Sequence, residues 1–420
     1  MNIVFLVRHH NDFDHALPIM DYLITKKKQK IIVYGVGEGY KNCKRHISFL
    51  KNVLSTKIIP FEEKYYSNLN RIVASIIDKR KLKNKKTSDN FLVRVVGANI
   101  NRILFYFLSG SAKRLVRSLS VDSVILADFG TEGLFPYKNI IKSAKKYEIK
   151  VIAYLHGWYV FRNKNPIRLE KIRFNKAKEF INKFIFGIGH NILHYDTYMV
   201  GPETNDTHFK SVLYKQSPSP SIVMELGVPR FSYEWMERFV NNWMRKEQLQ
   251  SNDDNIKVVV FISNEKFNVN KIELIDTLKE LSKNKRTTLL ISPHTRSGLS
   301  GLSKDDLFIS RHISKLDSTE LIKWADIGIV YGTSIGLQMM VENVTVVVPT
   351  YIDHNITMYK DYDACVSINS VRGLIKYIDR YPDRRDQPNP DDIKLFINNI
   401  IYGGHLNYED MMNKFTFFVK

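Results

Sequence analysis

Cysteine is scarce in this chain: only Cys43 and Cys365 occur among 420 residues, and they lie far apart in the sequence. No CxxC pair is present, and cysteine and histidine form no cluster with the spacing of a metal site. Such sparse use excludes a disulfide framework and is typical of a reducing compartment. We therefore expect no metal site.

Long hydrophobic runs are also missing. The most apolar long stretch, 91–108, is interrupted by two arginines and two asparagines, which excludes a membrane span. An apolar strand is expected at 2–7, where a signal peptide would have a basic segment and then a longer apolar run. These absences predict a soluble cytoplasmic protein, with contact at the inner face of the cytoplasmic membrane left open.

Acidic residues are outnumbered, with 43 Asp and Glu against 63 Lys and Arg, which leaves a net charge of +20. This excess favours a negatively charged partner such as an anionic lipid or a phosphorylated small molecule. The lysines form loose runs at 26–30 and 79–86 rather than a nucleic-acid-binding module, so nucleic acid is not expected. The basic, aromatic segment 167–186 fits either an anionic membrane surface or a solvated helix whose phenylalanines face the core.

Apolar segments that alternate with helical patterns make up most of the chain. Strands are expected at 2–7, 31–37, 121–127, 150–155, 257–264, 287–292, 307–310, 327–331 and 344–348. The first helix is expected at 16–26, with Asp14 as its cap. This alternation predicts βαβ units, and a length of 420 residues favours two domains.

The domain boundary is expected near the polar segment 250–255. We predict an α/β fold with two Rossmann-like domains that face each other across a cleft. The first domain covers 1–240 on the acceptor side, and the second covers 256–390 and binds the nucleotide sugar. A helical tail at 391–420 packs back on the first domain.

Polar residues follow two expected strands of the second domain, and ligands of open α/β sheets bind outside the carboxyl ends of strands. His294 and Arg296, after the strand at 287–292, offer donors to phosphate or ribose oxygens. Thr333 and Ser334 precede a helix, so their hydroxyls and backbone amides suit an anion. His294 as a core histidine, and simple helix capping by Thr333 and Ser334, remain the alternatives.

Other strand ends supply further candidates. Ser263 and Asn264, in the second domain, also suit phosphate oxygens. In the first domain Asp128, Glu132 and His156 follow two expected strands, and each could take the proton of an acceptor hydroxyl. Asp128 as a turn residue and His156 as a structural hydrogen bonder are the alternatives.

The second half resembles the nucleotide-sugar domain of GT-B glycosyltransferases, in particular those of bacterial surface polysaccharides. The likeness rests on Ser292-Pro293-His294, on Gly332-Thr333-Ser334 and on the run 316–348 as a whole. Asp128-Phe129-Gly130 is similar to the motif that supplies the base in CMP-sialic acid transferases. His156-Gly157-Trp158 is similar to an element of CDP-glycerol glycerophosphotransferases.

The resemblance implies an inverting, metal-independent transferase without a cofactor, which moves a sugar from a nucleotide donor to a glycan or lipid-linked glycan acceptor in surface polysaccharide biosynthesis. Gln338 stands where many GT-B enzymes carry a ribose-binding glutamate, which favours a CMP-linked donor over a UDP-linked one. A polyol-phosphate transferase that uses a CDP donor is one alternative. A catalytically silent, glycan-binding subunit is the other.

Overall fold

The computed structural model describes most of the chain. The described residues are 1–73, 108–155, 157, 160, 194–203, 222–242, 255–263, 269–294, 298–299, 302, 307–353, 355, 357–383 and 386–419. The predicted site residues His156, Asn264 and Arg296 lie outside this set, as does the segment 167–186.

The first domain contains a seven-stranded parallel sheet in the order β3-β2-β1-β4-β5-β6-β7. Its strands are β1 (Ile3–Val7), β2 (Ile31–Gly35), β3 (Ile58–Pro60), β4 (Val124–Asp128), β5 (Lys150–Tyr154), β6 (Thr197–Val200) and β7 (Ile222–Glu225). The strand order reverses between β1 and β4, and this is the point where such sheets place their ligands.

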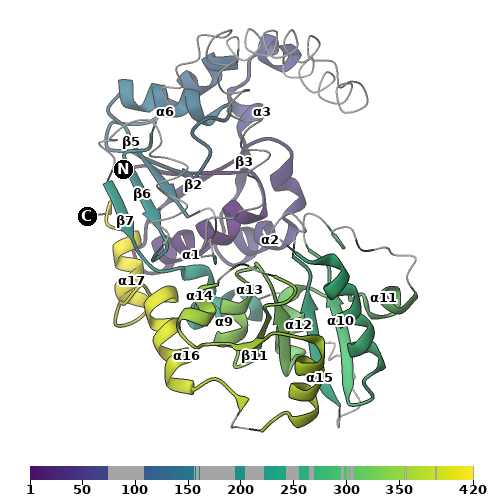
Figure 1. Ribbon diagram of the computed structural model, residues 1–420. Helices are drawn as coiled ribbons and strands as arrows, with labels where there is room; N and C mark the ends of the chain where they lie inside the picture. The colour runs from purple at the N-terminus through teal and green to yellow at the C-terminus, as the bar shows by residue number, and fades with distance from the viewer. Residues whose placement is uncertain are drawn as a thin grey trace, which may run out of the picture.

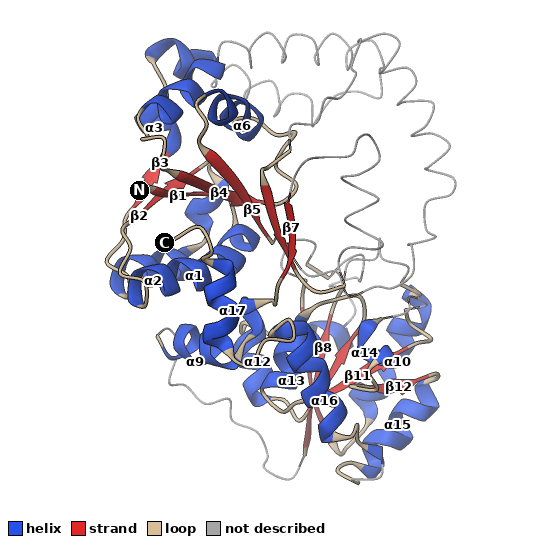
Figure 2. Ribbon diagram, turned by 90° about the vertical axis from the view of Figure 1, so that its left-hand side faces the viewer, coloured by secondary structure: helices blue, strands red, loops and turns tan. Residues whose placement is uncertain are grey.

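Helices cover both faces of this sheet (Figure 2). One apolar core lies under α1 (His10–Thr25), α2 (Lys44–Asn52) and α9 (Tyr233–Asn241). The other core lies under α3 (Phe61–Tyr65) and α6 (Tyr137–Lys146). Because both faces of the sheet are covered, the buried strands are continuous apolar runs in the sequence.

Helix α1 begins at His10, six residues earlier than predicted. Asp14 is not its cap and lies inside the helix. Asp12 in the first turn accepts the Arg8 backbone N–H at 2.8 Å, so the chain is already fixed at that point. Because α1 starts directly after β1, its first turn lies at the carboxyl end of the sheet.

The second domain contains a five-stranded parallel sheet in the order β12-β11-β10-β8-β9. Its strands are β8 (Ile256–Phe261), β9 (Thr287–Ser292), β10 (Ile327–Val330), β11 (Thr345–Pro349) and β12 (Val366–Ile368). Its helices are α10 (Lys271–Lys283), α11 (Leu307–His312), α12 (Ser318–Trp324), α13 (Ile335–Val341), α14 (Met358–Asp361) and α15 (Val371–Arg380). The strand predicted at 307–310 is wrong, because these residues belong to α11. An apolar run this short does not distinguish a strand from a helix.

The C-terminal segment returns to the first domain (Figure 1). It consists of α16 (Pro390–Phe396), the π-helical turn η7 (Ile397–Ile401) and α17 (Tyr408–Phe415). Three fully buried side chains of α17 join the core under α1, namely Met411, Met412 and Phe415. The prediction of two Rossmann-like domains with a C-terminal helix packed on the first is confirmed. Within the described ranges, no helix has the length and apolar character needed to cross a bilayer.

Candidate functional site

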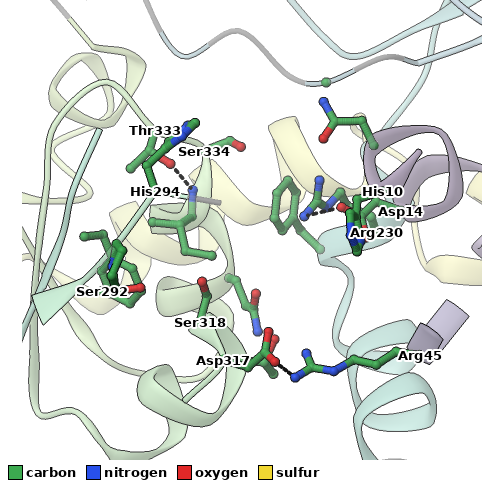
Figure 3. Close-up of a pocket in the computed structure, with 18 of the residues that line it drawn as sticks. His10, Asp14, Arg45, Arg230, Ser292, His294, Asp317, Ser318, Thr333 and Ser334 are labelled. Carbon is green, nitrogen blue, oxygen red and sulfur yellow. Dashed lines mark hydrogen bonds and ion pairs between the residues drawn. The ribbon is translucent and has the colours of Figure 1, made fainter. Parts of the chain in front are cut away.

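A cavity of about 650 Å³ lies between the two domains, and residues of both line it (Figure 3). The second domain contributes the ends of β8, β9 and β10 together with the starts of α12 and α13. The first domain contributes the starts of α1 and α2 and the turn η4 (Pro229–Phe231). Strand ends that meet at a domain interface are a preferred place for small ligands.

Four of the predicted donor-binding residues line this cavity: His294, Thr333, Ser334 and Gln338. Ser263 does not line it. The buried Ser263 hydroxyl instead donates to the Gly332 carbonyl oxygen at 3.4 Å, so it supports the loop that carries Thr333 and Ser334.

The loop between β10 and α13 is held by specific contacts. The Tyr359 hydroxyl donates to the Thr333 carbonyl oxygen at 2.8 Å. Gly332 has a φ of 60°, which an L side chain rarely adopts. The Thr333 hydroxyl accepts the Ile335 N–H at 3.4 Å, so Thr333 does cap this turn. Ser334 makes no capping bond with its side chain and is free of that role.

Gln338 is a buried polar side chain in the wall of the cavity, with 4% of its surface exposed. Its Nε2 atom has no hydrogen-bond partner among the described residues. A buried donor without a partner costs free energy, and a ligand oxygen in the cavity would remove that cost.

The opposite wall carries histidines and ion pairs that the sequence did not single out. Asp14 Oδ1 lies 2.8 Å from His46 Nε2, and Asp14 Oδ2 lies 3.1 Å from the Arg230 guanidinium. Burial opposes ionisation of Asp14, but Arg230 and His46 hold its pKa well below the usual range. Burial and the neighbouring His46 lower the pKa of His10 from its usual value, which favours the neutral imidazole.

One ion pair joins the two walls. Arg45 of α2 binds Asp317, which caps the start of α12 (Figure 3). Both side chains line the cavity, so this contact spans the cleft beside the ligand space.

The predicted base candidates Asp128 and Glu132 are not among the described residues that line the cavity. Asp128 is fully buried at the end of β4, and one of its oxygens accepts from the Arg8 guanidinium at 2.7 Å. Glu132 is also buried, and burial raises its pKa.

A strand-end rule applied to the first strand would have found His10, because it lies three positions after the end of β1, as Glu132 lies four positions after the end of β4. His46 and Arg230 carry no such signal. They reach the cavity from α2 and η4, and only the tertiary fold places them beside α1.

No model of a known protein family matches the chain, and no curated protein matches it by sequence. Solved structures do match its fold. The glycotransferase of kitacinnamycin matches with a TM-score of 0.52 and 9% identity, over 100% of this chain and 99% of that one. UDP-GlcNAc 2-epimerase from Neisseria meningitidis, bound to UDP-GlcNAc, matches with a TM-score of 0.52 and 11% identity over the same shares.

The UDP-forming α,α-trehalose-phosphate synthase from Burkholderia vietnamiensis matches with a TM-score of 0.50 and 10% identity, again over 100% of this chain and 99% of that one. At these identities the likeness concerns the fold alone. The chain has the two-domain architecture of GT-B glycosyltransferases.

Proposed function

We propose that the protein transfers a sugar from a nucleotide-activated donor to a hydroxyl group of a glycan or lipid-linked glycan. The observation that carries this proposal is the interdomain cavity, with polar strand ends on one wall and ionisable side chains on the other. Its volume of about 650 Å³ suits a ligand of nucleotide-sugar size. One structural neighbour is described as bound to UDP-GlcNAc, and another as UDP-forming.

The donor phosphate is assigned to the wall of the second domain. His294 and Ser334 offer side-chain donors to phosphate oxygens, and Gln338 offers its unpartnered Nε2 atom to the nucleoside or the phosphate. Fixed donors beside an oxygen that gains negative charge stabilise the leaving nucleotide. Arg296 and Asn264, outside the described residues, are proposed to extend this set.

The nucleotide base is proposed to be cytosine, on the strength of Gln338 where a ribose-binding glutamate would support UDP. The neighbours whose descriptions name a nucleotide name UDP, which makes a UDP-linked sugar the competing donor. A panel of nucleotides separates the two.

The acceptor hydroxyl is assigned to the first-domain wall, at His10 rather than at Asp128. A neutral imidazole at the cavity can accept a proton, whereas Asp128 is buried and ion-paired with Arg8. Acceptor and leaving phosphate would then lie on opposite walls, which supports inversion at the anomeric carbon.

A binding titration with CMP, CDP, UDP and GDP tests the donor site. We expect one of them to bind, and His294→Ala to weaken that binding about tenfold to a hundredfold, as for a lost hydrogen bond to a charged group. His405→Ala is the matched control, because His405 does not line the cavity. If none of the four nucleotides binds, the proposal fails.

Turnover separates the remaining functions. The mass of the product distinguishes sugar transfer from transfer of a polyol phosphate. Nucleotide binding without turnover on any acceptor would instead indicate a glycan-binding subunit.

A further inference from the structure

Three side chains with metal-binding atoms come together at the first-domain edge of the cavity. They are His10 at the start of α1, Cys43 directly before α2 and His46 in its first turn. One ligand atom of each lies within 4.8 Å of the other two. We propose that these three residues bind a zinc ion, with the fourth coordination position open to the cavity.

The residue types suit zinc. Two imidazoles and one thiolate form a borderline-soft set, and three protein ligands with one open position are typical of accessible zinc sites. With bonds of about 2.0–2.3 Å, ligand atoms around tetrahedral zinc lie roughly 3.3–3.8 Å apart. A side-chain movement of about 1 Å therefore closes the three groups around the ion.

His46 is already oriented as a metal ligand. Its Nε2 lies 2.8 Å from Asp14 Oδ1, and Arg230 helps to keep Asp14 ionised. The carboxylate therefore takes the N–H at Nε2, and the lone pair is left on Nδ1. Nδ1 is buried and has no hydrogen-bond partner within the described ranges. A carboxylate on the outer nitrogen of a ligating histidine is the usual support of a metal site.

Cys43 and His10 supply the remaining atoms. The Cys43 side chain is fully buried, and among the described residues its thiol has only a long contact of 3.7 Å to the Gly39 carbonyl oxygen. Burial raises the pKa of Cys43 to about 12, so binding of the ion would displace the thiol proton to solvent. His10 is exposed at the cavity and gives the ion an entry path.

The surrounding charges leave room for a cation. Arg230 is paired with Asp14, and Arg45 with Asp317, so the charges of these two cavity-lining arginines are already compensated. The inference does not rest on the proposed function. With an ion bound, His10 would be a metal ligand and could not itself accept the proton of the acceptor hydroxyl.

Metal binding to the full chain tests the site without any nucleotide. The purified protein is stripped with a chelator, titrated with Zn²⁺ or Co²⁺ and analysed for metal by mass spectrometry. We expect one ion per chain, and a thiolate-to-metal charge-transfer band with Co²⁺ that Cys43→Ser abolishes. Cys365→Ser, which removes the other cysteine, should retain both the bound ion and the charge-transfer band. Asp14→Asn should weaken binding about tenfold to a hundredfold, as other outer partners do.

His10→Ala changes an exposed side chain, so its loss of affinity is not a folding effect. Two results would overturn the inference: no bound metal above the level of Cys43→Ser, or a charge-transfer band that persists in that variant. Neither result touches the nucleotide titration, so failure of this site and of the proposed function can be told apart.

Discussion

At the scale of single residues, an ion network ties the two central strands of the first sheet to the start of α1. Arg8 follows β1, and its guanidinium contacts Asp12 in α1 at 3.1 Å and Asp128 at the end of β4 at 2.7 Å. Both carboxylates are fully buried. Because His10 lies between Arg8 and Asp12 in the sequence, this network fixes the backbone that presents His10 to the cavity. We therefore expect Asp128 to be a positioning residue.

Substitution of Asp128 separates the two roles. Asp128→Ala should lower the free energy of unfolding by on the order of 2 kcal/mol, because it removes one of the two carboxylates that compensate the half-buried charge of Arg8. His10→Ala should leave stability near that of the wild type and lower transfer about a hundredfold or more, as for loss of a general base. Urea denaturation and a transfer assay measure the two quantities. An Asp128→Ala protein of unchanged stability and no activity would instead make Asp128 the base.

The pH dependence of transfer gives a further check on His10. Burial lowers the pKa of His10 from its usual value, and the neutral form is the one that accepts a proton. The rate should therefore stay level above about pH 6.5 and fall as the pH drops through the pKa of His10. A rate that already falls as the pH is lowered from about 8 to about 7 would contradict this assignment.

At the scale of elements, the strands could be predicted because buried parallel strands are continuous apolar runs. The place of His294, Thr333 and Ser334 in the cavity wall could be predicted for the same reason, since they come shortly after two such strands, whereas their role in donor binding stays a prediction. The helical structure of 307–310 could not be predicted, because its three apolar residues are too few to show a periodicity. His46 and Arg230 were missed because they reach the cavity from α2 and η4, which carry no strand-end signal. His10 was overlooked although it follows β1. The proposed zinc ligands come from the starts of α1 and α2. Cys43 and His46 are close in the sequence, and only the fold brings His10 to them.

The return of the C-terminal segment depends on a close crossing of two backbones. The Val228 N–H donates to the Ile401 carbonyl oxygen at 2.7 Å. A Cβ atom on Gly227 would meet that carbonyl oxygen and Met411 Sδ. On the other side of the crossing, Gly403 has a φ of 64°. The glycine at 227 is therefore required by the packing of η7 and α17 on the first domain.

Gly227→Ala should destabilise the protein by about 1–3 kcal/mol, the usual cost of an overpacked contact. Gly133→Ala is the matched control, because a Cβ atom there has no neighbour within 4 Å among the described residues. Thermal or urea unfolding of the two variants measures the difference. Equal stability of Gly227→Ala and Gly133→Ala would mean that the two backbones can move apart at this crossing without loss of stability.

At the scale of the whole molecule, contacts between the domains set the width of the cleft. Besides the Arg45–Asp317 pair, the Tyr362 hydroxyl donates to Glu203 at 2.7 Å, and the Met358 N–H donates to the Val160 carbonyl oxygen at 2.9 Å. Tyr362 and Glu203 do not line the cavity, whereas Val160 and Arg45 do, and Arg45 closes the cleft on the side of α2. Loss of the Arg45 contact should therefore favour a more open arrangement.

Arg45→Ala breaks this contact alone, whereas a substitution of Asp317 would also remove the cap of α12. A partly exposed ion pair contributes up to about 1 kcal/mol, so the ratio of open to closed molecules should rise about fivefold. Small-angle X-ray scattering of the ligand-free protein should then show a larger radius of gyration, and nucleotide affinity should fall. Lys44→Ala removes the same charge from α2 without an ion pair to Asp317, so it should scatter like the wild type. If both variants scatter alike, Arg45 does not hold the cleft closed.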